Sequence, residues 1–387
     1  MYNTIEKISI YEFMLLIILY EVGTAIVVII GAEAKQDAWL AVIIATALGL
    51  ILFYIYYRSY LMKNGSFYEL LLHCLGKKIG TVTIAAYTVY FIYLTSRVLR
   101  DFNEVLLTVV LPNTPIEFSS ILFMGVVSYV LYLGFEVFSR TTVIFAPYLF
   151  LFLFAFAIFL IINSSVDLSN LQPVLSEGFK PVLKSIFPSL LTFPFGELIV
   201  FTIIFPQVVD ADKSFKPLAL AILTAGILIT CTVIINIGVL RESGYLRTNF
   251  PLLTTAREIS IADFIERLDP FVVFIVMLGV FVKVSVYLYC ALKGMEAIYK
   301  KPYRYFSFPI AMIAATSSVV IAFSLNEHLK EGLEIVPLYL HVPMQILIPM
   351  LIFVILLIKS RKKGDAENDK NHKNVQKNRG QGKETST

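Results

Sequence analysis

Leu19–Ala25 (LYEVGTA) and Thr192–Glu197 (TFPFGE) decide the fold of this chain. Each stretch lies inside a long apolar run, and each places Gly or Pro beside a carboxylate, Glu21 in the first and Glu197 in the second. Backbone groups freed within a bilayer need partners, so a broken span is tolerated only where it is buried or lines a cavity. Discontinuous helices of transporters present their peptide dipoles to a solute at such breaks. The two stretches therefore predict a small-molecule site at mid-depth in a membrane.

The composition of the 387-residue chain places it among membrane proteins. Hydrophobic residues make up 58%, mean hydropathy is +0.78 and charged residues are 16%, against about 25% charged in a soluble domain. Apolar runs long enough to cross a bilayer recur along the chain. We therefore predict an all-α polytopic protein with ten transmembrane helices, at 9–30, 38–58, 80–110, 115–134, 139–163, 181–205, 217–240, 268–292, 306–325 and 335–358.

The order of the spans predicts two related halves. Spans 1–5 and 6–10 are equal in number, and the broken span comes first in each half. Because five is odd, the second half enters the membrane from the opposite side, which is the pattern of a 5+5 inverted repeat with broken helices 1 and 6. The domain boundaries expected are a cytoplasmic N-terminus at 1–8, a transmembrane domain at 9–358 and a disordered basic cytoplasmic tail at 359–387.

The distribution of basic residues predicts the orientation. With the N-terminus inside, 21 of the 32 Lys and Arg residues fall in inside segments and eight in outside loops. The positive-inside rule therefore places both termini in the cytoplasm. The net charge of +4 follows from this bias and requires no nucleic-acid partner. The basic run 359–363 either contacts anionic lipid head groups or serves only as a stop-transfer flank.

Three ionisable residues at membrane depth are candidate functional groups, because burying a charge there costs about 2.5–3.5 kcal/mol on insertion scales. Glu21 is either a proton-titrating carboxylate or cation partner, or a carboxylate tied to freed backbone N–H groups. Glu197 either bonds the unwound backbone or receives a ligand ammonium. Lys283 either exchanges a proton or replaces a bound sodium ion, with Glu21 or Glu197 as partner, or forms an inert buried pair. Tyr287 lies one turn beyond Lys283 on the same face.

A fourth group of charges lies on span 3. Arg97–Asp101 and Arg100–Glu104 are both spaced i, i+4, so each pair can neutralise itself on one helix. Because this span starts inside, the cluster lies in the outer half, where it is either an extracellular gate or an internally satisfied ladder. The predicted gating or coupling charges are Glu21, Arg97, Arg100, Asp101, Glu104 and Lys283.

The outside loop 241–267 contains a predicted amphipathic helix. Thr254 or Thr255 is the expected cap with Glu258 as its partner, and the apolar stripe comprises Ile261, Phe264, Ile265 and Leu268. This helix is either a lid over the outer vestibule or an interfacial helix that only packs.

The sequence does not suggest an enzyme. It contains no phosphate-binding loop and no nucleophile–base pair, and its three Cys and four His residues show no metal-ligand spacing. We therefore expect no cofactor and no metal.

Six blocks of the sequence resemble a known family. They are Ile8–Ile10 (ISI), Gln36–Leu40 (QDAWL), Leu99–Phe102 (LRDF), Phe193–Glu197 (FPFGE) followed by Phe205–Pro206, Arg257–Ser260 (REIS) and Phe264–Asp269 (FIERLD). In this order and at these spans they resemble the B subunits of spore germinant receptors, the endospore germination permeases. That family belongs to the amino acid–polyamine–organocation superfamily and has the LeuT-type fold.

The resemblance implies a ligand-sensing subunit in the inner membrane of the dormant spore. Such subunits act with A and C subunits, bind a small germinant such as an amino acid, and trigger germination with release of cations. The site implied lies where spans 1, 3, 6 and 8 meet. Lys283 stands where many transporters of the superfamily have small or hydroxyl residues, which argues against a sodium site. The implied ligand-binding residues are Gly23, Thr24, Ala25, Phe195, Gly196, Glu197, Lys283 and Tyr287.

A second function fits the same sequence. The chain could be a proton-coupled amino-acid permease that works through Lys283 and a carboxylate. Fold alone does not separate a receptor from a permease.

Overall fold

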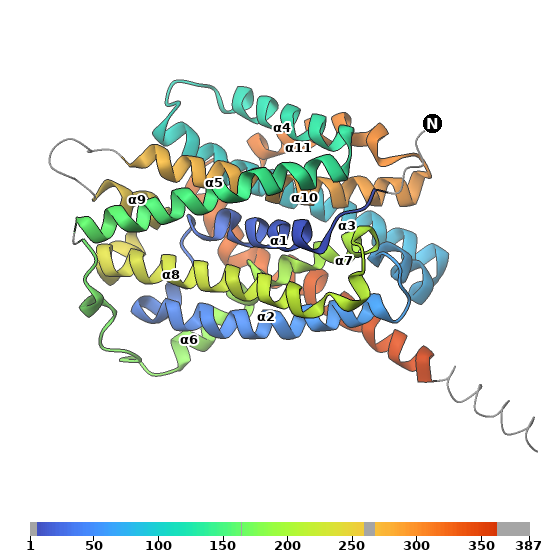
Figure 1. The fold of residues 1–387 in the computed structure, drawn as a ribbon, viewed down its shortest axis with the longest axis horizontal. Coiled ribbons are helices and arrows are strands. Elements are labelled where there is room, and N and C mark those ends of the chain that lie inside the picture. The colour runs from blue at the N-terminus through green and yellow to red at the C-terminus, as the bar shows by residue number, and fades with distance from the viewer. Residues whose placement is uncertain (1–5, 164, 259–267, 362–387) are drawn as a thin grey trace, which may run out of the picture.

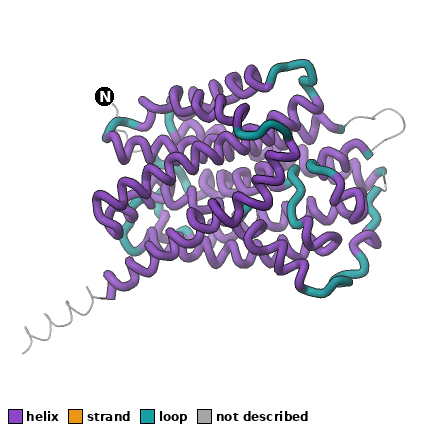
Figure 2. The backbone as a smooth tube through the Cα atoms, turned by 180° about the vertical axis from the view of Figure 1, so that it is seen from behind, coloured by secondary structure: helices purple, strands orange, loops and turns teal. Residues whose placement is uncertain are grey.

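The computed structural model of the chain describes residues 6–163, 165–258 and 268–361. Within these ranges the backbone is helix and loop (Figure 2), and one isolated bridge joins Ile8 to Val208. The all-α expectation is therefore confirmed for the described part of the chain. The bounds of the longer α-helices are α1 Ile10–Ala25, α2 Ala38–Leu61, α3 Phe67–Val109, α4 Ile116–Leu133, α5 Phe135–Ile162, α8 Phe215–Arg247, α10 Asp269–Tyr299 and α11 Ser307–Val320.

Shorter elements connect these helices or replace parts of them. Two of the expected spans are composite. The span expected at 181–205 combines α, π and 3₁₀ turns, and the span expected at 335–358 begins with π turns and continues as α-helix. The remaining elements are η1 Ala32–Asp37, η2 Leu168–Leu171, α6 Lys180–Ser185, η3 Ile186–Leu190, η4 Phe195–Val200, α7 Phe201–Ile204, η5 Phe205–Gln207, η6 Ala211–Lys213, α9 Pro251–Arg257, η7 Tyr303–Phe306, α12 Leu325–Lys330, η8 Glu331–Ile335 and η9 Pro337–Leu347.

Eight helices in the described ranges are long and apolar enough to cross a membrane. The count is nine if Tyr303–Val320 and Leu325–Ile335, which are bent by 109° at their junction, form one span. Ten spans were predicted. The difference includes the first span, where α1 has only 16 residues because the helix stops at Ala25. The ten-span 5+5 arrangement therefore stays a prediction, whereas a polytopic helical membrane protein is supported.

Helix α1 lies at the centre of the bundle (Figure 1), where it packs against α5 and α10 on one side and α8 on the other. Its first turn is fixed by Ser9 and Glu12. The Ser9 hydroxyl accepts from the Glu12 N–H at 3.2 Å, and the Ser9 N–H donates to the Glu12 carboxylate at 2.6 Å. This capping box satisfies two N–H groups that the helix leaves unpaired. All residues from Leu16 to Ala25 are buried, so α1 is a core element.

Both predicted breaks occur in the structure. Gly23 has φ 4° and ψ −104°, which is not helical, and the chain leaves the helix after Ala25. In the second broken span, a turn at Phe193 and Pro194 separates the upstream helix from the 3₁₀ segment η4. Glycine and proline thus interrupt the helices where the sequence places them.

A third interruption was not predicted. The stretch expected to be an ordinary tenth span begins with the π-helical segments η8 and η9, and η9 contains Pro337 and Pro343. A π turn leaves backbone carbonyls without their usual partners, and such turns are frequent at functional sites.

The predicted loop helix is only partly within the described residues. α9 begins at Pro251, so Thr254 and Thr255 lie inside the helix and the expectation that one of them caps it is wrong. Ile261, Phe264 and Ile265 lie outside the described residues, as do residues 1–5 and 362–387.

Candidate functional site

A buried ion pair joins the second broken span to α10. The Lys283 ammonium lies 2.5 Å from a carboxylate oxygen of Glu197, and both side chains are almost fully buried, at 0% and 3% exposed. The rings of Phe193 and Tyr20 flank the ammonium at 4.7 and 5.2 Å from their centroids. Aromatic faces attract a cation most strongly when it is desolvated. Of the two partners predicted for Lys283, the structure selects Glu197.

The break in α1 lies directly against this pair. A Cβ on Gly279 of α10 would be 2.7 Å from the Gly23 Cα, so the two backbones touch where these helices cross. A Cβ on Gly23 would be 3.0 Å from Cδ of Lys283. Small residues allow helices to approach this closely in a membrane. The crossing therefore brings the unwound part of α1 to the stem of the buried lysine.

Glu21 is a buried carboxylate beside the ion pair. It is fully buried, and neither of its oxygens accepts a hydrogen bond from the described residues. The alternative in which freed backbone N–H groups tie it down is therefore wrong. Lys283 and Glu197 both interact electrostatically with it. When all three groups are ionised, the cluster carries one excess negative charge, which a proton or a cationic group can compensate.

Aromatic side chains form one wall of the site. The ring of Tyr287 packs edge-on to Tyr20 at 5.4 Å between centroids and stacks on Phe91 at 6.3 Å. The Tyr20 hydroxyl donates to the backbone carbonyl of Glu197 at 3.2 Å. Tyr287 is therefore close to the ion pair, as its position one turn after Lys283 predicts. Thr24 is also buried here, and its hydroxyl has no partner among the described residues.

Two predicted site residues face elsewhere. Phe195 packs on α2, because a Cβ on Gly49 would lie 2.6 Å from the Phe195 Cβ. Gly196 lies against the side-chain amide of Gln345 on η9. Successive residues of a 3₁₀ turn point in different directions, so Phe195 and Gly196 contact other elements than Glu197 does, and their role as ligand-binding residues stays a prediction. Ala25 is buried with the rest of the break.

A cavity of about 50 Å³ lies beside the Glu197 end of the ion pair. At about 10–15 Å³ for each water centre, it has room for about three to five water molecules. Glu197 and Phe193 lie at its wall, so the cavity reaches the site defined by the breaks. Its other polar lining residues are Arg97, Asp101 and His341.

Two polar residues of the cavity lining, Arg97 and Asp101, belong to a wider cluster of charged and polar side chains. Arg97 pairs with Glu331 at 3.4 Å and donates to the backbone carbonyl of His328. The His328 Nε2 lies 2.8 Å from an oxygen of Asp101. These contacts join α3 to α12 and η8. We refer to Arg97, Asp101, His328 and Glu331 as the outer cluster.

The outer cluster corrects one predicted pairing and confirms another. Arg97 and Asp101 do not pair with each other as predicted from their i, i+4 spacing, because each finds a partner on another element. Arg100 and Glu104 do pair within α3, at 2.8 Å. The predicted pairing within one helix is therefore confirmed for Arg100 and Glu104 and wrong for Arg97 and Asp101.

Sequence reasoning missed His328, Glu331, His341 and Gln345. Gln345 and His341 contact the same tyrosine, Tyr90, at 2.8 Å. The available signal was the three prolines of the tenth predicted span, Pro337, Pro343 and Pro349, because prolines mark irregular backbone where side chains of a membrane helix can enter a cavity. The histidines were set aside because no metal-ligand spacing joins them.

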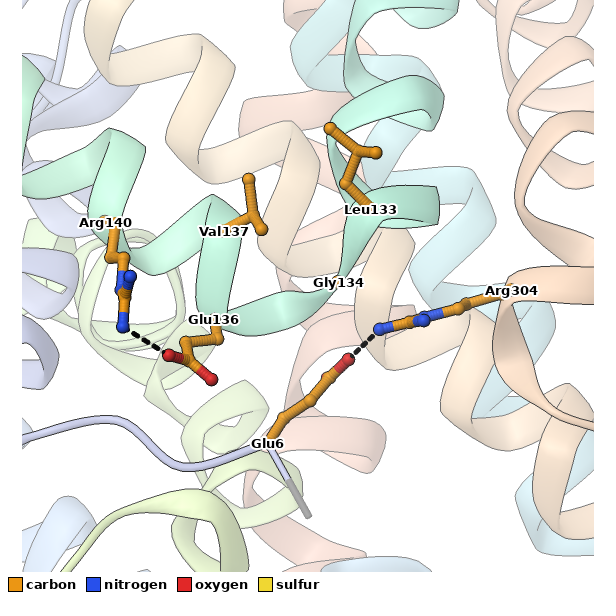
Figure 3. A pocket seen from close by; sticks show the side chains of 7 residues that line it. All are labelled: Glu6, Leu133, Gly134, Glu136, Val137, Arg140 and Arg304. Atoms are coloured by element: carbon orange, nitrogen blue, oxygen red, sulfur yellow. Dashed lines mark hydrogen bonds and ion pairs between the residues drawn. The ribbon is translucent and has the colours of Figure 1, made fainter. Parts of the chain in front are cut away.

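A larger cavity of about 430 Å³ lies at the end of the bundle where the chain begins (Figure 3). Its charges are paired with one another. Glu6 reaches Arg304 at 2.5 Å, and Glu136 pairs with Arg140 at 2.5 Å within α5. The first pair joins the N-terminal segment to η7, whereas the second stays within α5, and neither includes Lys283 or Glu197.

Comparison with known proteins gives a consistent result. A model of the family described as spore germination protein matches residues 7–331. Spore germination protein KB of Bacillus subtilis (strain 168) is 37% identical over 361 residues, covering 92% of this chain and 96% of that protein. The putative spore germination protein YfkT is 26% identical over 368 residues (92% and 97%), and spore germination protein YndE is 25% identical over 314 residues (78% and 84%), both from the same organism.

Proposed function

The chain belongs to the spore germination protein family, and from this premise we propose that it is the ligand-sensing subunit of a spore germinant receptor. In this proposal it binds a small nutrient, such as an amino acid, at mid-depth in the inner spore membrane. Its partners are the A and C subunits of the receptor, and both of its termini lie in the cytoplasm. Ligand binding triggers germination and cation release through the assembled complex.

One observation carries the proposal. The Glu197–Lys283 pair lies where the two broken spans meet α10, and a small cavity leads from it to the outer cluster. A buried ion pair is a poor source of stability, because the cost of desolvation offsets much of the attraction. Its position beside a cavity favours a role in ligand recognition.

The geometry supports a simple mechanism. An anionic group of the ligand competes with Glu197 for the Lys283 ammonium, while a cationic group takes the place of that ammonium at Glu197 or compensates Glu21. Charge-assisted hydrogen bonds of this kind are about twice as strong as neutral ones. The ligand then shifts the equilibrium of the receptor by its difference in affinity for the two states.

The proposal is tested in spores that lack the native chain and carry this one with its A and C subunits. A panel of L-amino acids, sugars and nucleosides is scored for loss of refractility and cation release. We expect at least one response, and we expect the double variant Lys283→Met, Glu197→Leu to abolish it at unchanged protein level. The matched control replaces Lys293 and Glu296, a partly exposed pair at the end of α10, in the same way. Silence of the unmodified spores to the whole panel, or a normal response of the double variant, would refute the proposal.

A second candidate function, the proton-coupled permease, is favoured by Glu21. A buried carboxylate without hydrogen-bond donors among the described residues can carry a proton across a conformational change. Counterflow of labelled amino acids into proteoliposomes that contain only this chain separates the two functions. Robust uptake that Glu21→Gln removes would support the permease.

A further inference from the structure

A chain of three buried side chains reaches the cavity from the π-helical segment. His341 and Gln345 lie one turn apart on η9, and Tyr90 lies on α3. The Tyr90 hydroxyl is 2.8 Å from the His341 Nδ1 and 2.8 Å from the Gln345 Nε2. The three residues are at most 5% exposed, and the His341 ring lines the cavity beside Glu197.

The proton positions follow from the partners. The Gln345 amide donates to the Tyr90 oxygen, so the Tyr90 O–H needs an acceptor of its own. The His341 Nδ1 is within reach, and a buried hydroxyl without an acceptor would be destabilising. Tyr90 therefore donates to Nδ1. In a neutral imidazole whose Nδ1 accepts, Nε2 carries the hydrogen.

The segment that carries the histidine is itself held by tyrosines. Tyr87 of α3 donates to the backbone carbonyl of Met344 at 2.5 Å, and Tyr56 of α2 donates to that of Gln345. Pro349 has no N–H to offer the carbonyls four and five residues before it, so these bonds supply the missing donors and fix η9 against two long helices. Gly196 leaves the space that the Gln345 amide occupies. The position of the ring is thus set from α2, α3 and η4 together.

We propose that His341 is a ligand-contacting residue whose Nε2–H donates a hydrogen bond to an oxygen acceptor of the solute, with Tyr90 and Gln345 as positioning residues. This inference rests on the proposed function, because it adds a residue of η9 to the same ligand site. It assigns Glu197 to cationic groups of the ligand and His341 to an acceptor. The solute class is a small polar molecule that carries an acceptor oxygen.

The first test does not depend on any ligand. The full-length chain, labelled with ¹⁵N-histidine and purified in detergent, contains four histidines, and His341→Gln identifies the signals of interest. We expect the nitrogen shifts of a neutral ring protonated at Nε2. Tyr90→Phe should turn this into a mixture of tautomers, whereas Tyr129→Phe, on the exposed face of α4, should leave the spectrum unchanged. A ring protonated at Nδ1, or a spectrum indifferent to Tyr90→Phe, would overturn the inference.

The second test measures recognition in complemented spores, with an equimolar mixture of the twenty standard L-amino acids as the probe. We expect His341→Ala to raise the half-saturating concentration at least tenfold at unchanged protein level, and His341→Gln, which retains an N–H donor, to raise it less. His73→Ala, at an exposed position of α3, is the matched control. A His341→Ala curve that coincides with the unmodified one would refute the contact. If unmodified spores ignore the mixture, the amino-acid proposal fails, and the nuclear magnetic resonance result still decides the inference.

Discussion

A side chain added to Gly23 would meet Lys283 before any other residue. The closest approach is 3.0 Å to Cδ, and the Gly279 carbonyl lies at 3.6 Å. Both contacts are on α10, so an added group pushes the broken helix away from the ion pair. The glycine is thus required because the backbones of α1 and α10 cross closely at this point.

We predict that Gly23→Leu abolishes the ligand response while the protein remains in the membrane. Overpacking of a buried site typically costs about 1–3 kcal/mol and forces side chains and backbone beside it to shift. Dose–response curves and immunoblots of spore membranes measure the two effects. Gly125→Ala on α4 is the control, because its Cβ would meet no atom within 4 Å. Normal responsiveness of Gly23→Leu would contradict the placement of the site.

Removing only one member of the ion pair should cost more than removing both. Lys283→Met leaves Glu197 buried without its cation, a change that typically costs about 3–5 kcal/mol, whereas replacing a whole buried pair with apolar residues is often neutral. We therefore expect thermal unfolding in detergent to show a clear loss of stability for Lys283→Met and recovery in the double variant with Glu197→Leu. Equal midpoints for the single and double variants would show that the two charges are not coupled.

At the scale of elements, tyrosines support the irregular backbone. Pro349 has no N–H for the carbonyls of Met344 and Gln345, and hydroxyls from α2 and α3 donate to these carbonyls instead. We predict that Tyr87→Phe destabilises the protein by about 1–3 kcal/mol, because a buried carbonyl loses its donor. Thermal unfolding in detergent is the measurement. Tyr129→Phe, which removes an exposed hydroxyl, should not shift the midpoint.

How far the sequence predicts these elements depends on the range of the interactions. Gly23 and Pro194 act on their own helices, so both breaks could be located from local sequence. Lys283 and Glu197 could be matched because few other charges lie at membrane depth. Arg97 could not be matched, since the i, i+4 rule considers only its own helix, while Glu331 lies 234 residues away in the sequence. Local pattern likewise could not show that Phe195 turns toward α2.

At the scale of the whole molecule, the outer cluster joins α3 to α12 and η8, and two of its members, Arg97 and Asp101, line the cavity. We predict that Glu331→Gln favours an open state by up to about 1 kcal/mol, or about fivefold, which is the upper range for partly exposed ion pairs. The readout is the rate at which an impermeant maleimide labels a cysteine placed at Val98, a residue of the cavity wall. Glu334→Gln, at an exposed position on the same π-helical segment, is the control. Equal labelling rates in both variants would exclude a gate.

The connection between Lys7, Ile8 and the second broken span has a consequence for biogenesis. Lys7 binds the carbonyl of Pro206, 199 positions later, and Ile8 exchanges backbone hydrogen bonds with Gln207 and Val209. The ribosome must therefore have synthesised more than half of the chain before its first residues can take their final place. Until then the first segment, which is interrupted and charged, has to stay at the translocon without the residues that it contacts in the folded protein.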